Sequence, residues 1–216
     1  MTLREERKRQ TRQLLLDAAL RLASAGGGFA GVSLREVARE AGVVPTAFYR
    51  HFQGLNELGL ALLDDVFLTL RKIMRDARVS AQGAGDVAIR ASVDGFLWYV
   101  RAHSEAFEFV ARERFGGPPV IRQAIAREMH YFVGELVSDL RLFVPLANMP
   151  SDDLEMIAEL VVQTVLGLTA EILYLPAGQE RREREITERA IKQLRLIFLG
   201  ALQWQPERGA VRSGKA

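Results

Sequence analysis

Hydrophobic residues recur along most of the chain at the spacing of three and four residues that is typical of amphipathic helices. Leu14, Ala18 and Leu22 follow one another at intervals of four residues, which predicts a first helix over about Glu5–Ser24. No segment shows the alternation of polar and apolar residues expected of strands, and no internal repeat is present. The pattern therefore predicts an all-α protein.

Glycine and proline divide this pattern into about nine predicted helices. We expect them over about 5–24, 34–41, 45–52, 55–78, 86–103, 105–115, 119–144, 152–175 and 182–203. The segment 79–86 is expected to be a linker. Ser151 is expected to cap the eighth helix, with Asp152 and Asp153 at its positive end. The tail 205–216 has almost no apolar residues and is expected to be disordered.

Two of the predicted helices are short and joined by a tight turn. Ser33 and Glu36 form a capping-box pattern that opens the first of them, and Gly42 ends it. Pro45 suits the first position of the second, because its fixed φ and missing N–H cost nothing there. The pair forms a helix-turn-helix pattern, in which the second helix enters the major groove of DNA.

The second short helix divides into an inward and an outward face. Val44, Phe48 and Phe52 lie four residues apart and are expected to face the core. The outward residues include small side chains that can approach base edges, and polar or basic ones that can bind a base or a phosphate. A capped helical hairpin with ordinary surface charges is the alternative interpretation. The start of the first short helix offers free N–H groups to a phosphate, and the basic N-terminal helix can add further contacts. The predicted DNA-binding residues are therefore Arg4, Lys8, Arg12, Ser33, Leu34, Arg35, Pro45, Thr46, Ala47, Tyr49, Arg50 and His51.

The distribution of charge also favours a polyanionic partner for the N-terminal part. Residues 1–52 carry nine Lys and Arg against five Asp and Glu, a net charge of +4. Since the whole chain carries +2, the remaining residues carry −2. A basic end on a nearly neutral body is typical of proteins that bind nucleic acid.

Composition excludes several other classes of protein. The 216 residues are 49% hydrophobic and 26% charged, as in an ordinary soluble globular protein. There is no cysteine, which excludes disulfides, thiolate metal sites and cysteine nucleophiles, and the three histidines lack metal-ligand spacing. No nucleophile motif or phosphate-binding loop is present, so no catalytic residue, metal or cofactor is predicted. The charged start and the lack of about 18 uncharged apolar residues in a row predict a cytoplasmic protein without a membrane span.

The stretch SLREVAREAGVVPTAFYRHFQGLNELG (33–59), which follows a basic helix and GGFAGV, strongly resembles the N-terminal domain of TetR-type transcriptional repressors. The resemblance implies that residues 1–54 form a three-helix DNA-binding domain. It implies that residues 55–204 form a larger helical domain for ligand binding and dimerisation, with 55–78 as the linking helix. The expected target is double-stranded DNA with a palindromic operator, its half-sites about one turn apart.

Leu55 narrows this resemblance, because many members of the family carry a lysine there. A hydrophobic residue at this position resembles the fatty-acid repressors FabR and DesT. ARERFGG (111–117) and AREMHYFVGEL (126–136) are also similar to them, and the similarity weakens after about residue 145. Those relatives sense long-chain acyl-CoA and control unsaturated fatty acid synthesis or desaturation. The resemblance implies that an unsaturated chain favours the DNA-bound form and a saturated chain the relaxed one.

Aromatic side chains gather in the middle helices, where an apolar cavity would suit an acyl chain. For any single one of them, an ordinary core role is the favoured alternative. Cations at its mouth would bind the CoA head group. Arg101, His103 and Arg122 are candidates beside Arg112 and Arg114, which lie in the resembling motif. Surface salt bridges are the alternative role for these cations. The predicted ligand-binding residues are Phe96, Trp98, Tyr99, Phe107, Phe109, Arg112, Arg114, Phe115, Met129 and Phe132.

The last two predicted helices carry a broad apolar surface, and Gly167, Ala170 and Gly200 permit close approach. The resemblance implies a homodimer that packs four of these helices together. The apolar residues concerned are Leu154, Ile157, Val161, Val165, Leu168, Ile172, Ile186, Ile191, Leu194, Ile197, Phe198 and Ala201. Three alternatives stay open: a TetR-type repressor that responds to another hydrophobic molecule, as in efflux control; an acyl-CoA-handling enzyme; and a lipid carrier, which would not need the surface at 46–51.

Overall fold

The computed structural model describes residues 2–80, 85–176 and 178–205. Over these residues the chain forms nine α-helices and two short 3-10 helices, without a β-strand. The elements are α1 (Leu3–Ala25), η1 (Phe29–Gly31), α2 (Leu34–Glu40), α3 (Pro45–Phe48), α4 (Leu55–Ser80), α5 (Gly85–Ala102), α6 (Ser104–Gly116), α7 (Pro119–Leu142), η2 (Val144–Leu146), α8 (Ser151–Leu173) and α9 (Glu180–Gln203). The all-α prediction is confirmed. The predicted linker 79–86 is wrong at both ends, because residues 79–80 belong to α4 and residues 85–86 to α5. Its middle, 81–84, and the tail from 206 onwards lie outside the described residues.

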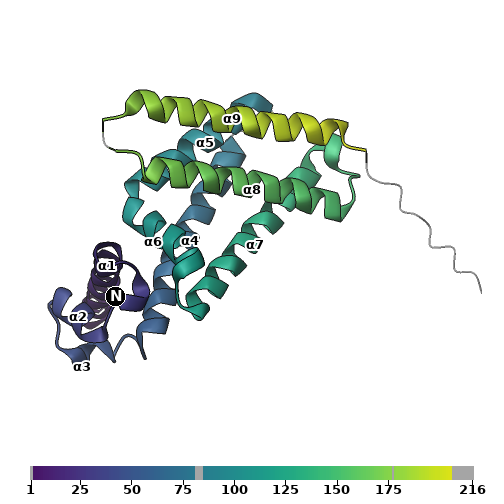
Figure 1. Cartoon of the computed structure of the whole chain (residues 1–216). Helices are drawn as coiled ribbons and strands as arrows, with labels where there is room; N and C mark the ends of the chain where they lie inside the picture. Colours follow the sequence, from purple (N-terminus) through teal and green to yellow (C-terminus); the bar gives the residue numbers. More distant parts are fainter. Residues whose placement is uncertain (1, 81–84, 177, 206–216) are drawn as a thin grey trace, which may run out of the picture.

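The helices form a small N-terminal group and a larger body (Figure 1). α1, α2 and α3 gather at one end, and α4 leads from them into the body, where it packs against α5. α7 packs between α4 and α8, and the long helices α8 and α9 lie side by side along the far edge. α6 packs against α7 and also contacts α8. α6 returns to contact α1, so the body touches the N-terminal group at a second point besides α4.

A single hydrophobic cluster joins the N-terminal helices to the base of the body. It includes Leu15 of α1 and Phe48 of α3, together with Phe67 of α4, Phe109 of α6 and Ile121 of α7. Two further clusters lie between α5, α8 and α9, and around η2 at the other end of α8 and α9. The predicted boundary after residue 54 therefore falls between helices that share a core, and the division into two domains stays a prediction.

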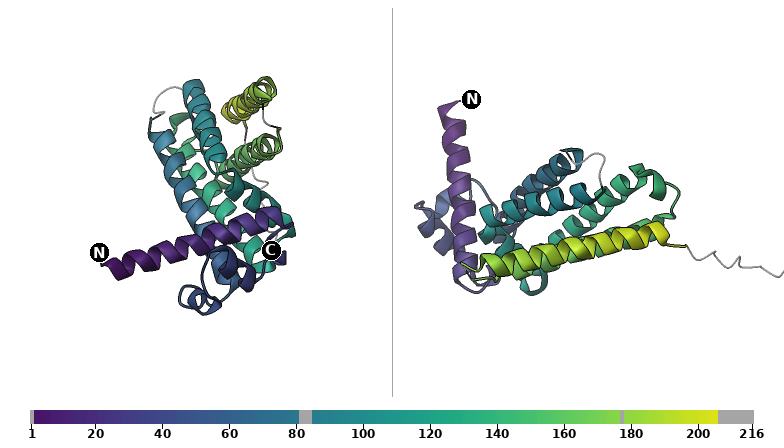
Figure 2. Two further views of the ribbon diagram at one scale, coloured as in Figure 1. Left: turned by 90° about the vertical axis from the view of Figure 1, so that its left-hand side faces the viewer. Right: turned by 90° about the horizontal axis from the view of Figure 1, so that it is seen from above.

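α1 changes character along its length. Its N-terminal half is almost entirely exposed and projects from the rest of the molecule (Figure 2). Thr2 caps it, because the Thr2 hydroxyl accepts from the Glu5 N–H and the Glu5 carboxylate accepts from the Thr2 N–H. The helix is confirmed, but Leu14 is 41% exposed. The buried face is carried instead by Leu15, Leu16, Ala18, Ala19 and Ala23.

The start of α8 differs from the prediction. Pro150 occupies the cap position, and Ser151 is the first helical residue, so Ser151 does not cap the helix. The Ser151 hydroxyl accepts a hydrogen bond from Arg141 at 2.6 Å instead. Asp152 and Asp153 lie in the first turn as predicted, where the helix dipole favours negative charge.

The apolar residues predicted to form the outer surface of α8 and α9 face mostly inward. Leu154 and Ile191 are fully buried, and most of the others are buried or half-buried in the protein's own core. A different set is exposed on these two helices: Met156, Leu160, Leu196, Leu199 and Leu202. Among the described helices, α8 alone is long and apolar enough to cross a membrane, which is weak evidence because core helices of soluble proteins meet the same criterion.

Candidate nucleic-acid interface

α2 begins at a complete capping box. The Ser33 hydroxyl accepts a hydrogen bond from the Glu36 N–H at 3.3 Å, and the Glu36 carboxylate accepts from the Ser33 N–H at 3.0 Å. Glu36 also accepts from the Ser33 hydroxyl at 2.6 Å. The hydrogen bond from the Ser33 hydroxyl, followed by that from the Ser33 N–H, holds the pKa of the exposed Glu36 carboxyl below its ordinary value of 4.5. The predicted cap is confirmed.

Gly42 makes the sharp turn between α2 and α3. Its φ of 68° lies in the left-handed region, which glycine reaches without steric cost. The turn is closed by the Gly42 N–H donating to the Arg39 carbonyl and the Val43 N–H donating to the Ala38 carbonyl, at 3.1 and 2.9 Å. Pro45 then occupies the first turn of α3, as predicted.

α3 is shorter than predicted, since it ends at Phe48 and a turn carries the chain onward to His51. Phe48 and Phe52 are buried as expected, and their ring centroids lie 5.7 Å apart. The expectation that Val44 faces the core is wrong, because Val44 is 64% exposed. Val44 is the extended cap residue before the helix, with φ −74° and ψ 146°, so helical spacing does not place its side chain.

The outward face of α3 and its turn is available to a partner. Thr46, Tyr49 and Arg50 are exposed, whereas Ala47 and His51 are half-buried. The Tyr49 ring packs edge-to-face on the buried Phe48 ring, at 5.8 Å between centroids. A buried aromatic support therefore holds a slim, polar and basic surface outward, which suits base edges and phosphates.

The basic side of α1 lies next to this surface. The Arg12 guanidinium sits 5.0 Å from the centroid of the Phe52 ring, where the ring quadrupole attracts a cation. Arg4 and Lys8 are exposed in the projecting half of the same helix. Arg21 of α1 also pairs with Glu40 of α2 at 3.1 Å. Arg12 thus lies against the end of the α3 turn, and Arg21 links α1 to α2.

His51 lies between these two helices. Burial lowers its pKa below the ordinary value of 6.5, and the positive charges of Lys8, Arg12 and Arg50 lower it further. Its Nδ1 atom is buried without a hydrogen-bond partner among the described residues. The surroundings of His51 therefore favour its neutral form.

The remaining predicted DNA contacts are placed unevenly. Ser33, Arg35 and Pro45 are exposed. Leu34 is half-buried and packs against the core, so its side chain contributes to folding. Which of these residues contact DNA stays a prediction.

The predicted ligand-binding aromatics do not share one environment. Tyr99, Phe107 and Phe96 pack edge-to-face in the core, and the Tyr99 hydroxyl donates to the Val66 carbonyl at 3.3 Å. Phe109 is also buried, while Met129 and Phe132 are half-buried against the same core. Two members stand apart, because Trp98 is 67% exposed and Phe115 is 78% exposed. Their role in ligand binding stays a prediction.

The candidate head-group cations already have partners in the described structure. Arg112 donates to the Ala23 and Ser24 carbonyls at 2.9 and 3.3 Å, and Arg122 donates to the Gly117 carbonyl at 2.6 Å. Arg101 pairs with Glu183 of α9. Arg114 lies 5.1 Å from the centroid of the exposed Phe115 ring, at the end of α6. The exposed His103 precedes α6, and its ring contacts Tyr99. A CoA head group would have to compete with these contacts.

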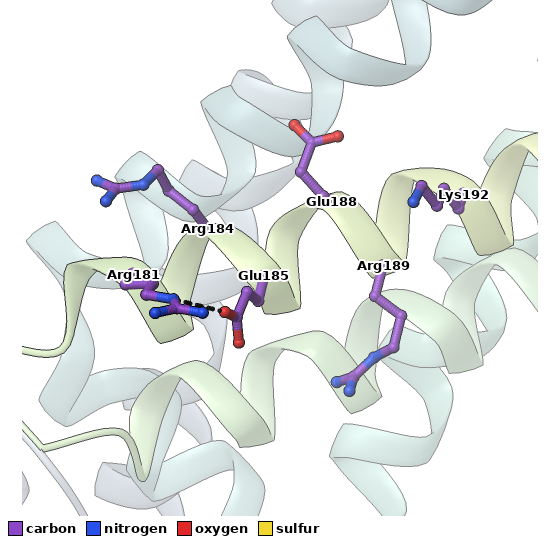
Figure 3. Close-up of a pocket in the computed structure, with 6 residues that line it drawn as sticks. All are labelled: Arg181, Arg184, Glu185, Glu188, Arg189 and Lys192. Carbon is purple, nitrogen blue, oxygen red and sulfur yellow. Dashed lines mark hydrogen bonds and ion pairs between the residues drawn. The ribbon is translucent and has the colours of Figure 1, made fainter.

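A shallow hollow on α9 offers no obvious ligand site (Figure 3). Charged side chains of both signs line it: Arg181, Arg184, Glu185, Glu188, Arg189 and Lys192. Glu185 pairs with Arg181 at 3.0 Å, and Arg189 pairs with Glu171 of α8 at 2.5 Å. Four cations and two carboxylates line the hollow, and Glu171 and Glu180 outside it pair with Arg189 and Arg184. None of the predicted ligand-binding residues lines it.

Sequence reasoning missed Glu113 of α6. Its side chain is 2% exposed, and its carboxylate accepts a hydrogen bond from the Phe29 N–H at 2.8 Å. The Phe29 ring packs edge-to-face on Phe109 at 5.7 Å. Both segments lie in motifs that carry the family resemblance, but no feature of a single sequence indicates contact between residues 84 positions apart.

These features define a class of protein. A capped helix, a glycine turn and a short second helix anchored by two phenylalanines form a helix-turn-helix module on a larger helical body. Residues 15–62 match the family described as bacterial regulatory proteins, tetR family. Residues 86–200, more than half of the chain, match the tetracyclin repressor-like C-terminal domain. The chain belongs to the tetR family, whose members are dimeric regulators that bind operator DNA rather than enzymes.

Solved structures share this fold. A transcriptional regulator from Rhodococcus sp. Rha1 is 22% identical with a TM-score of 0.66, and the match covers 89% of this chain and 96% of that one. The SmeT–triclosan complex is 19% identical with a TM-score of 0.66, over 88% and 90% of the two chains. The fatty acid degradation regulator FadR from Bacillus halodurans is 13% identical with a TM-score of 0.63, over 94% and 96%. At these identities the likeness establishes the fold.

Proposed function

We propose that this protein is a cytoplasmic, ligand-responsive repressor that binds a palindromic operator as a homodimer. The observation that carries DNA binding is the exposed face of Thr46, Tyr49 and Arg50, which rests on two buried phenylalanine rings. Thr46 and Ala47 keep the tip of α3 slim enough to approach base edges. Tyr49, Arg50 and His51 meet a base or the backbone, and the cations of α1 bind neighbouring phosphates.

The dimer forms through the exposed apolar side chains of α8 and α9. Leu160, Leu196 and Leu199 are each at least 49% exposed, and a second copy would remove them from water. Gly167 and Gly200 have no atom close to the position of an added Cβ, so they leave room for a neighbouring helix. A two-fold axis through this face matches the two-fold symmetry of a palindromic operator.

The effector is a long-chain acyl-CoA, and the regulated genes serve unsaturated fatty acid synthesis or desaturation. Three features support this proposal: the motifs shared with FabR and DesT, the aromatic cluster of the body, and the likeness to a fatty acid degradation regulator. An effector acts only through unequal affinity for the DNA-competent and DNA-incompetent forms. α4 joins both parts of the chain and is the element through which the difference is transmitted.

The effector is tested on an operator selected from genomic DNA by the purified protein. Operator affinity is measured by fluorescence anisotropy with oleoyl-CoA, palmitoyl-CoA and free CoA. We expect the two thioesters to change the affinity unequally and free CoA to leave it unchanged. Equal affinities in all three would exclude an acyl-CoA effector while leaving operator binding established.

A second candidate is a repressor that responds to another hydrophobic small molecule, as in efflux control. The similarity to the SmeT–triclosan complex favours it, since triclosan is an apolar aromatic compound. The same anisotropy assay with triclosan separates the two candidates. Release of the operator by triclosan, without a response to either thioester, would favour the second.

A further inference from the structure

The turn that follows α1 is closed partly by its own backbone, because the Gly26 N–H donates to the Leu22 carbonyl and the Gly28 N–H to the Ala23 carbonyl, at 2.9 and 3.1 Å. α1 has no basic residue in its last turn to interact with the negative end of the helix dipole. η1 begins without a side-chain cap, because Gly28 stands at its cap position. Gly27 and Gly28 have φ values of 86° and 120°, which only glycine adopts readily. The turn itself supplies no charged side chain at either end, so charges from another element add to its stability.

Two consecutive residues of α6 supply charges of the required sign. The Arg112 guanidinium donates to the Ala23 and Ser24 carbonyls at the negative end of α1. The Glu113 carboxylate accepts from the Phe29 N–H at the positive start of η1. A buried carboxylate is costly unless it is hydrogen-bonded, so Glu113 strongly favours the one position of Phe29 that satisfies it.

The space around Glu113 exists only because two neighbours are glycines. A Cβ on Gly117 would lie 2.5 Å from Glu113 Oε2 and 2.7 Å from the Glu113 carbonyl oxygen. A Cβ on Gly28 would lie 3.0 Å from Glu113 Oε1. The carboxylate is therefore enclosed on both sides by backbone, which fixes its position.

The Phe29 ring connects the same turn to α6 and α4 of the body. It packs on Phe109 of α6, and a Cβ on Gly59 of α4 would lie only 2.8 Å from the ring and 2.7 Å from Ile121 of α7. The turn is thus seated in the body by an aromatic ring and held by two charges of α6.

The geometry points to Arg112 and Glu113 as positioning residues that set the orientation of the DNA-binding helices on the body. This inference rests on the proposed operator binding. Lys8 precedes Ser24 by 16 residues, about 24 Å along a helix, so a tilt of about 5° at the turn moves Lys8 by about 2 Å. Such a shift breaks phosphate contacts in both halves of a dimer. In this role the two residues act through the end of α1 and the Phe29 turn rather than by contacting DNA.

The test compares Glu113→Ala with Glu113→Gln, which keeps an acceptor oxygen for the Phe29 N–H. Glu105→Ala is the matched control, because Glu105 is an exposed glutamate on the same helix. Gly117→Ala is an independent perturbation that displaces the carboxylate without removing it. Operator affinity, melting temperature and the distance between spin labels on the two DNA-binding modules are measured for each variant. The native chain has no cysteine, so Arg39→Cys at the exposed end of α2 gives one label per protomer.

We expect Glu113→Ala and Gly117→Ala to lose about 5- to 150-fold in operator affinity, the usual range of coupling between sites. The label distances should broaden in both, while Glu113→Gln and Glu105→Ala stay close to wild type. A lower melting temperature with unchanged affinity and unchanged distances would reduce Glu113 to a stabilising residue and overturn the inference. If Glu113→Ala does not fold, Gly117→Ala and Glu113→Gln decide by the same readouts. If the wild type binds no operator, the proposed function fails. The label distances in DNA-free protein still test whether Glu113 sets the orientation of the DNA-binding helices on the body.

Discussion

Removing Lys8 tests whether the projecting half of α1 binds the DNA backbone. Lys8 is exposed, and Lys→Ala in a helix changes the helix propensity little, so Lys8→Ala should leave folding intact. Its charge is one of the three that lower the pKa of His51, which places it close to the surface of α3. The substitution therefore removes a phosphate contact without disturbing the anchors of the recognition helix.

The expected magnitude follows from counterion release. If Arg4, Lys8, Arg12 and Arg50 each neutralise one phosphate, a dimer neutralises about eight, and the slope of log affinity against log salt is about −7. Lys8→Ala removes two of these contacts and reduces the slope to about −5.4. Between 50 and 200 mM salt the wild type should lose about four orders of magnitude in affinity and the variant about three.

Fluorescence anisotropy titrations at five or six salt concentrations measure this slope directly. Lys192→Ala is the matched control, because Lys192 is an exposed lysine on α9, which lies in the body away from α1–α3 (Figure 1). The control should keep the wild-type slope. Equal slopes for Lys8→Ala and the wild type would refute a phosphate-binding role for this half of α1.

Three further predictions concern the core, the titration of His51 and the dimer. Phe48→Ala should lower the free energy of unfolding by about 3–5 kcal/mol, because Phe48 is fully buried. Val44→Ala should change it by less than about 0.5 kcal/mol, because Val44 is exposed. Urea denaturation measures both variants, and equal effects would contradict the placement of Val44. The pKa of His51 in the folded protein lies below its ordinary value of 6.5, so protonation of His51 opposes folding. The stability that neutral His51 contributes is present above pH 6.5 and is lost as the pH falls below 6.5. The wild type should therefore lose more stability than His51→Gln between pH 7.5 and 5.5. Leu199→Glu should produce folded monomers in sedimentation velocity. The control is Leu68→Glu, which changes a similarly exposed leucine on α4 and should stay dimeric. A dimeric Leu199→Glu variant would argue against the α8–α9 face.

Local signals predicted the helix-turn-helix well. The Ser33–Glu36 cap, the left-handed Gly42 and the buried Phe48 and Phe52 each depend on residues close in sequence, and the structure confirms them. The prediction that Val44 faces the core was wrong, because it extended the helical period to a residue that precedes the helix. The Ser151 cap failed in a similar way, because α8 begins one residue earlier than predicted. Local prediction was therefore reliable inside the helices and weaker at their first residue.

Features that depend on tertiary packing were not predictable in the same way. The apolar residues of α8 and α9 have helical spacing on more than one face, and the period alone does not tell the protein's own core from a dimer face. Arg112 has the positive charge expected of a residue that binds the CoA head group, but its hydrogen-bond partners lie 88 and 89 residues away in α1. Trp98 and Tyr99 are adjacent in sequence, yet only Tyr99 is buried, because successive helical residues point in directions about 100° apart.

The core shared by α1, α4, α6 and α7 limits how freely parts of this family can be exchanged. A chimera that joined the first 54 residues of a relative to this body would place a foreign turn against Glu113. Unless that turn presented an N–H where Phe29 does, a charged group would be left buried and unsatisfied. Recombination that gives this body a new operator specificity must therefore bring a compatible end of α6, or keep the native turn and change only the surface of α3.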